Sequence, residues 1–198
     1  MELPVVQPVT PKERADAVAN RQRILDAATR LFAENGVGCT SMDAIAAAAG
    51  VGKGTVFRRF GDRASLALAV LDASETTLQE AMIRGPAPLG PGAPPRDRLL
   101  AFGDAMLDRL EEHHEILLEA EISHGSYLRS EPHAVHRTHT RHLLAQLRPD
   151  ADNEYLVDVL LAPLTARVFT DQRHHRGLTL KQLKAGYADT VCRLTRDC

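Results

Sequence analysis

The stretch Ala46–Phe60, AAAAGVGKGTVFRRF, decides between two kinds of phosphate-binding fold. Glycines beside a Gly-Lys pair are typical of nucleotide-binding loops, whereas an alanine-rich segment, a glycine turn and a short basic helix are typical of DNA readers. A Walker A loop would need glycine at Ala47 and a hydroxyl side chain at Gly54, and a dinucleotide fingerprint would need glycine at Thr55. Both motifs also follow a buried strand, but an alanine-rich helical pattern precedes this stretch. The residues therefore argue against a nucleotide-binding loop.

The same stretch has the spacing of a helix-turn-helix. Two helices can cross closely only where the first offers a small residue, here Ala46, and Gly50 four residues later suits the turn. Val51 fills the angle between the helices, and Val56 packs inward from the second helix. With Val56 inward, the second helix presents a basic and polar outer face, made of Lys53, Thr55, Arg59 and the nearby Phe57. This arrangement predicts contact with DNA.

The rest of the chain is predicted to be helical. Apolar residues recur at helical spacing from about Ala17, and no segment alternates as a strand would. We therefore expect an all-α protein of about nine helices. A flexible arm is expected at 1–16 and a helix-turn-helix domain at 17–66, with the motif itself at about 41–60. The second domain is expected at 67–198 and includes a loop at 85–95. Helical patterns in the second domain cover about 96–120, 131–147, 152–172 and 179–196. Pro163 predicts a kink in the third of these.

Composition and charge are those of an ordinary globular protein. The chain is 44% hydrophobic and 25% charged, and it has neither the apolar run of about 20 residues that spans a membrane nor the pattern of a signal peptide. We expect a cytoplasmic protein without membrane contact. The net charge is −2, but residues 1–63 carry nine Lys/Arg against seven Asp/Glu, and residues 64–198 carry fifteen against nineteen. This mildly basic front permits DNA binding.

Cysteine and histidine usage favours no metal or disulfide site. The three cysteines, Cys39, Cys192 and Cys198, are odd in number and form no CxxC pair. Four of the nine histidines, His133, His136, His139 and His142, recur every three residues. Such a series drifts around a helix, so we expect a polar, partly exposed face rather than a metal site, and no cofactor. A metal- or redox-responsive sensor remains an alternative.

The motifs together resemble a known family. The segment Arg21–Asp72, RQRILDAATRLFAENGVGCTSMDAIAAAAGVGKGTVFRRFGDRASLALAVLD, resembles the DNA-binding domain of TetR-family (tetracycline-repressor-like) transcriptional regulators. The resemblance implies a homodimer whose two recognition helices enter successive major grooves of operator DNA. It also implies an all-α second domain that binds a small-molecule effector, here expected to be largely apolar, and a repressor that the effector releases from DNA. An α-helical enzyme is a further alternative, but no catalytic constellation is found.

The resemblance also indicates which residues contact DNA. By spacing alone, either Thr40 or Ser41 can cap the first helix of the motif, and the resemblance favours Thr40 as cap and phosphate contact. Gly52 stands where the family often has a capping serine, and Phe57 where it often has tyrosine, so we expect the arginines to supply more of the affinity. The expected DNA-binding residues are Thr40, Ser41, Lys53, Gly54, Thr55, Phe57, Arg58, Arg59 and Arg63.

The second domain is expected to hold the effector and the dimer interface. Apolar residues at helical spacing in the last two helices form the expected interface: Leu156, Leu160, Leu164, Leu183, Tyr187 and Val191. The expected effector pocket is lined by Phe102, Met106, Leu110, Leu117, Tyr127 and Phe169. Each of these residues can equally belong to the plain hydrophobic core of one chain.

Overall fold

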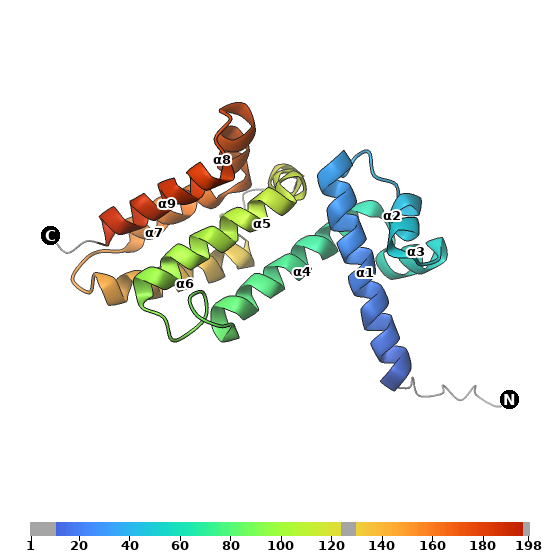
Figure 1. Cartoon of the computed structure of the whole chain (residues 1–198), viewed down its shortest axis with the longest axis horizontal. Helices are drawn as coiled ribbons and strands as arrows, with labels where there is room; N and C mark the ends of the chain where they lie inside the picture. The colour runs from blue at the N-terminus through green and yellow to red at the C-terminus, as the bar shows by residue number, and fades with distance from the viewer. Residues whose placement is uncertain (1–10, 124–129, 196–198) are drawn as a thin grey trace. The chain divides into compact units, whose positions relative to one another are not determined.

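A computed structural model of the chain describes residues 11–123 and 130–195, and these residues contain helices and no strand (Figure 1). They form nine α-helices, with a 3-10 turn after α7 and a π-helical turn after α8. The chain divides into two compact units, residues 1–70 and 71–198. The predicted all-α class is confirmed. Within the described residues, no helix has both the length and the apolar character needed to cross a membrane.

The first unit holds α1 (Pro11–Asn35), α2 (Met42–Ala49), α3 (Lys53–Phe60) and the start of α4 (Arg63–Arg84). α1 begins at Pro11 rather than at Ala17, because proline suits a first helical turn and the residues that follow are good helix formers. The helix therefore extends into the expected arm. The core of this unit is apolar, with Ile24, Ala28, Phe32, Ile45, Val56 and Leu66 almost fully buried.

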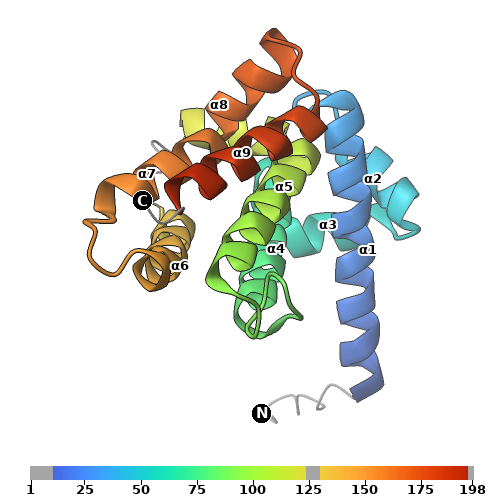
Figure 2. The same cartoon turned by 60° about the vertical axis from the view of Figure 1, so that its left-hand side comes forward.

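The second unit holds the remainder of α4, α5 (Pro95–Ser123), α6 (Glu131–Leu147), α7 (Glu154–Leu161), α8 (Ala166–Thr170) and α9 (Leu180–Leu194). α5 packs against α6, α8 and α9, and Figure 2 shows α5 and α9 side by side. Gly103 permits the close approach of α5 to α9, because a Cβ atom at this position would lie inside the ring of Tyr187. The core includes Phe102, Met106, Leu143, Leu160, Phe169 and Val191.

The predicted single helix over 152–172 is wrong. α7 ends at Leu161, a 3-10 turn covers Ala162–Leu164, and Thr165 has an extended backbone (φ −96°, ψ 150°) before α8 begins. Pro163 explains the break, since its ring has no N–H to donate and collides with the carbonyl one turn earlier. The proline ends the helix instead of bending it.

Candidate nucleic-acid interface and a buried polar cluster

The turn between α2 and α3 is built by its glycine. Gly50 adopts a left-handed backbone (φ 63°), and the N–H of Val51 donates to the carbonyl of Ala46 over 3.0 Å. Ala46 and Val56 are buried, as the motif requires. α3 is described in full and buries Val56 alone. Lys53, Phe57, Arg58 and Arg59 are exposed on the remainder of α3, so this helix presents a largely basic surface to a partner.

The expected contact residues on α3 lie on its accessible surface. Lys53, Gly54 and Arg58 are exposed, Thr55 is half-buried, and the Phe57 side chain is 40% exposed. The Lys53 ammonium lies 2.7 Å from a carboxylate oxygen of Asp43 on α2. Because a solvated ion pair contributes little free energy, Lys53 can exchange Asp43 for a phosphate at small cost.

Two of the three expected arginines make backbone contacts inside the first unit. Arg59 donates a hydrogen bond to the carbonyl of Ala17 on α1 over 2.7 Å. Arg63 donates to the carbonyl of Gly38 over 2.6 Å and contacts that of Thr40 at 3.4 Å. Arg58 has no hydrogen bond or ion pair with any described residue. Sequence reasoning missed these contacts, because a carbonyl partner depends on the path of the backbone.

The expected cap at Thr40 is wrong. The Ser41 hydroxyl caps α2 by accepting a hydrogen bond from the backbone N–H of Ala44 over 3.1 Å. Thr40 is only 3% exposed, and its hydroxyl contacts the carbonyls of Leu31 (3.1 Å) and Gly36 (2.9 Å) at the end of α1. One hydroxyl proton serves two acceptors, so the side chain fastens the turn between α1 and α2.

A buried crossing point, a left-handed glycine turn and an exposed basic second helix define a helix-turn-helix DNA-binding protein. The sequence model of the family described as "Bacterial regulatory proteins, tetR family" matches residues 24–70. The chain is 30% identical over 174 residues to the HTH-type transcriptional regulator SAR2658 of Staphylococcus aureus (strain MRSA252), covering 85% of this chain and 90% of that protein. It therefore belongs to the TetR family of transcriptional regulators.

Further similarities agree with this assignment. The chain is 41% identical over 69 residues to the HTH-type transcriptional regulator AcrR of Shigella flexneri, a match that covers 35% of this chain and only 32% of AcrR. A TetR-family regulator from Rhodococcus sp. has the same fold, with a TM-score of 0.67, 16% identity and coverage of 90% of this chain and 100% of that one. FadR from Bacillus subtilis, solved in complex with stearoyl-CoA, has a TM-score of 0.60 at 16% identity, covering 86% and 96%.

The residues expected to line a pocket or a dimer interface lie largely in the core of the second unit. Of the expected pocket residues, Leu117 is half-buried, Tyr127 lies outside the described residues, and the other four are almost fully buried. Of the expected interface residues, Leu156 is half-buried and the other five are buried within one chain. Helical spacing alone could not separate these roles, because core and interface stripes have the same period.

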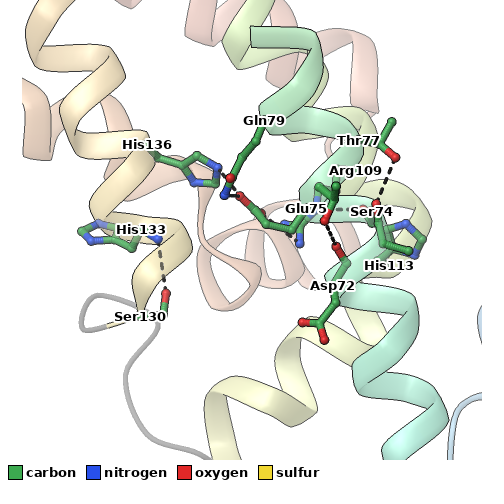
Figure 3. A network of polar contacts seen from close by, with 12 residues as sticks. Asp72, Ser74, Glu75, Thr77, Gln79, Arg109, His113, Ser130, His133 and His136 are labelled. Carbon is green, nitrogen blue, oxygen red and sulfur yellow. Dashed lines mark hydrogen bonds and ion pairs between the residues drawn. The ribbon is translucent and has the colours of Figure 1, made fainter. Parts of the chain in front are cut away.

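A cluster of buried polar side chains joins α4, α5 and α6 (Figure 3). Glu75 on α4 lies 3.3 Å from a guanidinium nitrogen of Arg109 on α5 and 3.0 Å from Nε2 of His136 on α6. The amide of Gln79 donates to Glu75 over 2.7 Å, and Arg109 donates from Nε to the Ser74 hydroxyl over 2.9 Å. Glu75, Arg109, His113 and His136 are buried, and Ser74 and Gln79 at their edge are half-buried. We call these six residues the buried polar cluster.

The cluster controls the ionisation of its members. Burial alone would raise the pKa of Glu75, but its contact with His136, the charge of Arg109 and the amide of Gln79 together hold that pKa below its ordinary value. Burial, and then the nearby charge of Arg109, lower the pKa of His113 to about 4. Glu75 is therefore a carboxylate at neutral pH, and His113 is a neutral imidazole.

The expected exposed histidine face on α6 is wrong for half of the series. His133 and His136 are buried, His139 is half-buried and His142 is exposed, so the series does drift around the helix. The packing of α6 turns the first two inward. Among the described residues, no three His, Cys, Asp or Glu side chains gather in an arrangement that could hold a metal ion.

Proposed function

We propose that this chain is a cytoplasmic transcriptional repressor that binds operator DNA as a homodimer and is released by a small-molecule effector. The observation that carries the proposal is α3, a short basic helix that buries only Val56 and follows a left-handed glycine turn. Its N-terminus carries Gly52 and Gly54, which let the backbone approach DNA closely. The similarity to SAR2658 over 90% of that regulator supports the proposal.

The DNA contacts fall into two groups. Lys53 and Arg58 are exposed cations at opposite ends of α3, and Arg58 has no competing partner among the described residues. Lys53 and Thr55 lie at the start of the helix that faces base edges in this motif, whereas the arginines near its end suit phosphates. Arg59 and Arg63 hold the helix in place through their backbone contacts and add positive charge.

The effector response is proposed to travel through α4. This helix begins in the first unit and continues into the second, where Glu75 joins the buried polar cluster. An effector that changes the contacts of Glu75 would shift α4 along with the residues at its start. The spacing of the two recognition helices in the dimer would then no longer match one DNA turn of about 34–36 Å.

The dimer is proposed to form through the exposed faces of the last two helices. Because Leu183, Tyr187 and Val191 are already buried in one chain, a partner would contact the opposite face of α9, which exposes Ala185 and Asp189. Ala185, a small residue on this face, permits close contact between helices across a twofold axis.

One experiment tests the whole proposal. The purified protein is used to select bound fragments from genomic DNA, and the selected sequence is labelled for fluorescence anisotropy while sedimentation gives the stoichiometry. We expect a pseudo-palindromic site bound by a dimer, with an affinity that falls steeply with salt. Recovery of no sequence-specific fragment would overturn the repressor, and an effector that binds without altering operator affinity would overturn the release mechanism.

A further inference from the structure

We propose that the effector is a neutral amphipathic molecule whose polar end donates a hydrogen bond to Nδ1 of His113 in the buried polar cluster. The inference rests on the proposed function, since it names the chemical class of the small molecule that releases the protein from DNA. Several buried polar atoms of the second unit have no hydrogen-bond partner among the described residues.

His113 offers a buried acceptor without a partner. The side chain is 6% exposed, and Nδ1 has no hydrogen-bond partner among the described residues. Nε2 of the same ring lies 3.7 Å from a carboxylate oxygen of Glu112, which favours the proton on Nε2 and leaves a lone pair on Nδ1. Burial and then Arg109 lower the pKa of His113 to about 4, so the ring is neutral at neutral pH and keeps one nitrogen as an acceptor. A hydroxyl or N–H group is the complement of such an atom.

The charges around His113 select against ionic ligands. The carboxylate of Glu75 is already matched by Arg109 and contacts His136. A ligand ammonium group would meet the guanidinium of Arg109, one helical turn before His113, and would be repelled. A ligand carboxylate has no proton to give to Nδ1, and it would compete with Glu75 for Arg109. A neutral donor satisfies His113 without disturbing this balance.

The surroundings of His113 suit an apolar body. Residues three and four positions away share its face of α5, and besides Arg109 these are Leu110, Ile116 and Leu117. Leu110 and Ile116 are almost fully buried, and Leu117 is half-buried. A ligand with an aryl or alkyl body would therefore pack against apolar groups while its polar end meets His113.

A second unused group lies on α6. The hydroxyl oxygen of Thr140 is fully buried without a hydrogen-bond partner among the described residues, one helical turn beyond His136. Buried polar atoms normally find partners, so each of these unmatched atoms, Nδ1 of His113 on α5 and the Thr140 hydroxyl on α6, indicates a place for a ligand or for water.

A ligand whose polar end lies at His113 would also be placed to affect DNA binding. Arg109 bridges α5 to α4 through Ser74 and Glu75, and His113 follows Arg109 by one turn on α5. A ligand seated on His113 would move Arg109 and loosen its contacts with α4. The same helix runs back into the DNA-binding unit, so ligand binding and DNA release would be coupled.

The test uses four probes with one apolar body and different polar ends: phenylbutanol, its methyl ether, phenylbutylamine and phenylbutyrate. Their binding to the full-length protein is measured by calorimetry, and operator release by anisotropy. We expect the alcohol to bind about five- to tenfold more tightly than the ether, the gain of one neutral hydrogen bond, and more tightly than either ion. Equal binding of alcohol and ether, tighter binding of an ion, or binding of none at millimolar concentration would overturn the inference.

Three variants test whether His113 is the residue that favours the alcohol over the ether. His113→Leu should reduce the alcohol-to-ether ratio to about one, and His113→Asn, whose amide oxygen can accept in place of Nδ1, should retain most of it. His142→Leu, on the exposed side of α6, should leave the ratio unchanged. Circular dichroism and operator binding report whether each variant folds. Unaltered selectivity in a folded His113→Leu protein would overturn the inference, while operator binding in the absence of any probe tests the proposed function separately.

Discussion

Arg58 and Arg59 are neighbours in the sequence, but their surroundings differ. Arg59 donates a hydrogen bond to the carbonyl of Ala17 on α1, whereas Arg58 is exposed and makes no hydrogen bond or ion pair with the described residues. A guanidinium that already has a partner contributes to the fold as well as to binding, and a solvated one is available to phosphate alone. The two residues therefore provide a matched pair.

The pair yields a prediction on salt dependence. Replacing either Arg58 or Arg59 by alanine should lower the slope of log K for operator binding against log salt by about 0.9 per protomer, because we propose that each contacts one phosphate. Arg59→Ala should also reduce the free energy of unfolding by about 1 kcal/mol through loss of its bond to α1, and Arg58→Ala should not. Anisotropy over a salt series and urea unfolding measure the two effects. An unchanged slope in both variants would contradict the phosphate role.

Thr40 gives a prediction that separates structure from recognition. Thr40→Val removes the hydroxyl that serves the carbonyls of Leu31 and Gly36 and leaves both without this donor. We expect a loss of about 1–3 kcal/mol in unfolding free energy, with operator affinity unchanged per folded molecule. Thr40→Ser keeps the hydroxyl and should retain most of the stability. A Thr40→Val protein of normal stability but weak operator binding would show instead that the side chain contacts DNA.

At the scale of elements, α3 combines glycines that weaken helix formation with the close approach to DNA that we propose for it. Its N-cap, Gly52, makes no side-chain cap, and Gly54 in its first turn has open space where a Cβ would lie. Glycine at these two positions reduces helix stability, and we infer that the two glycines serve DNA binding rather than stability.

Gly54→Ala is therefore expected to raise the unfolding free energy and to lower the affinity for the operator. The methyl group meets no atom of the protein and raises helix propensity, so the unfolding free energy should increase by up to about 1 kcal/mol. The same methyl group would hold the backbone of α3 away from the groove and weaken operator binding. Thermal unfolding and anisotropy on the same sample measure both. Operator affinity equal to that of the parent would remove Gly54 from the interface.

At the contact of α5 with α9, replacing a glycine by alanine is expected to lower the unfolding free energy. Gly103→Ala places a methyl group inside the Tyr187 ring, and we expect a loss of about 2–3 kcal/mol in unfolding free energy. Gly186→Ala, in α9 with open space where the methyl group would lie, is the matched control and should be neutral or slightly stabilising. Adding Tyr187→Leu to Gly103→Ala should restore part of the loss, a coupling that a double-mutant cycle detects. Additive losses would show that the two residues do not meet.

Helices with strong local signals were predictable, and those shaped by packing were not. α6 has the predicted bounds, because the Ser130 side chain caps it and Pro132 lies in its first turn. The break after α7 was expected only as a kink, since a proline inside an apolar pattern can bend or end a helix depending on its neighbours. The helix-turn-helix was predictable because its small, glycine and apolar positions act within fifteen residues.

At the scale of the whole molecule, the buried polar cluster could not have been predicted. Glu75, Arg109 and His136 lie far apart in the sequence and meet only when three helices pack. On α6 alone, a polar series indicates solvent, and nothing local shows that His136 turns inward to meet a carboxylate. The exposed residues of one helix could be predicted from the sequence, whereas polar contacts between helices required the fold.

The stability of the protein should decrease in mild acid. Burial and Arg109 lower the pKa of His113 to about 4, and burial with the charges of Arg98, His136 and His142 does the same for His139, from an ordinary value of 6.5. Between about pH 6.5 and 4 the unfolded chain binds more protons, so the unfolding free energy should fall by about 1.4 kcal/mol per pH unit for each histidine. Glu75, whose pKa is lowered, adds a further loss only at still lower pH.

Urea unfolding between about pH 6.5 and 4 measures how the unfolding free energy changes with pH. His113→Leu should reduce this slope by about 1.4 kcal/mol per pH unit, and His142→Leu should leave it nearly unchanged. A free energy that stays constant from neutral pH to pH of about 5 would show that these imidazoles are not buried in solution.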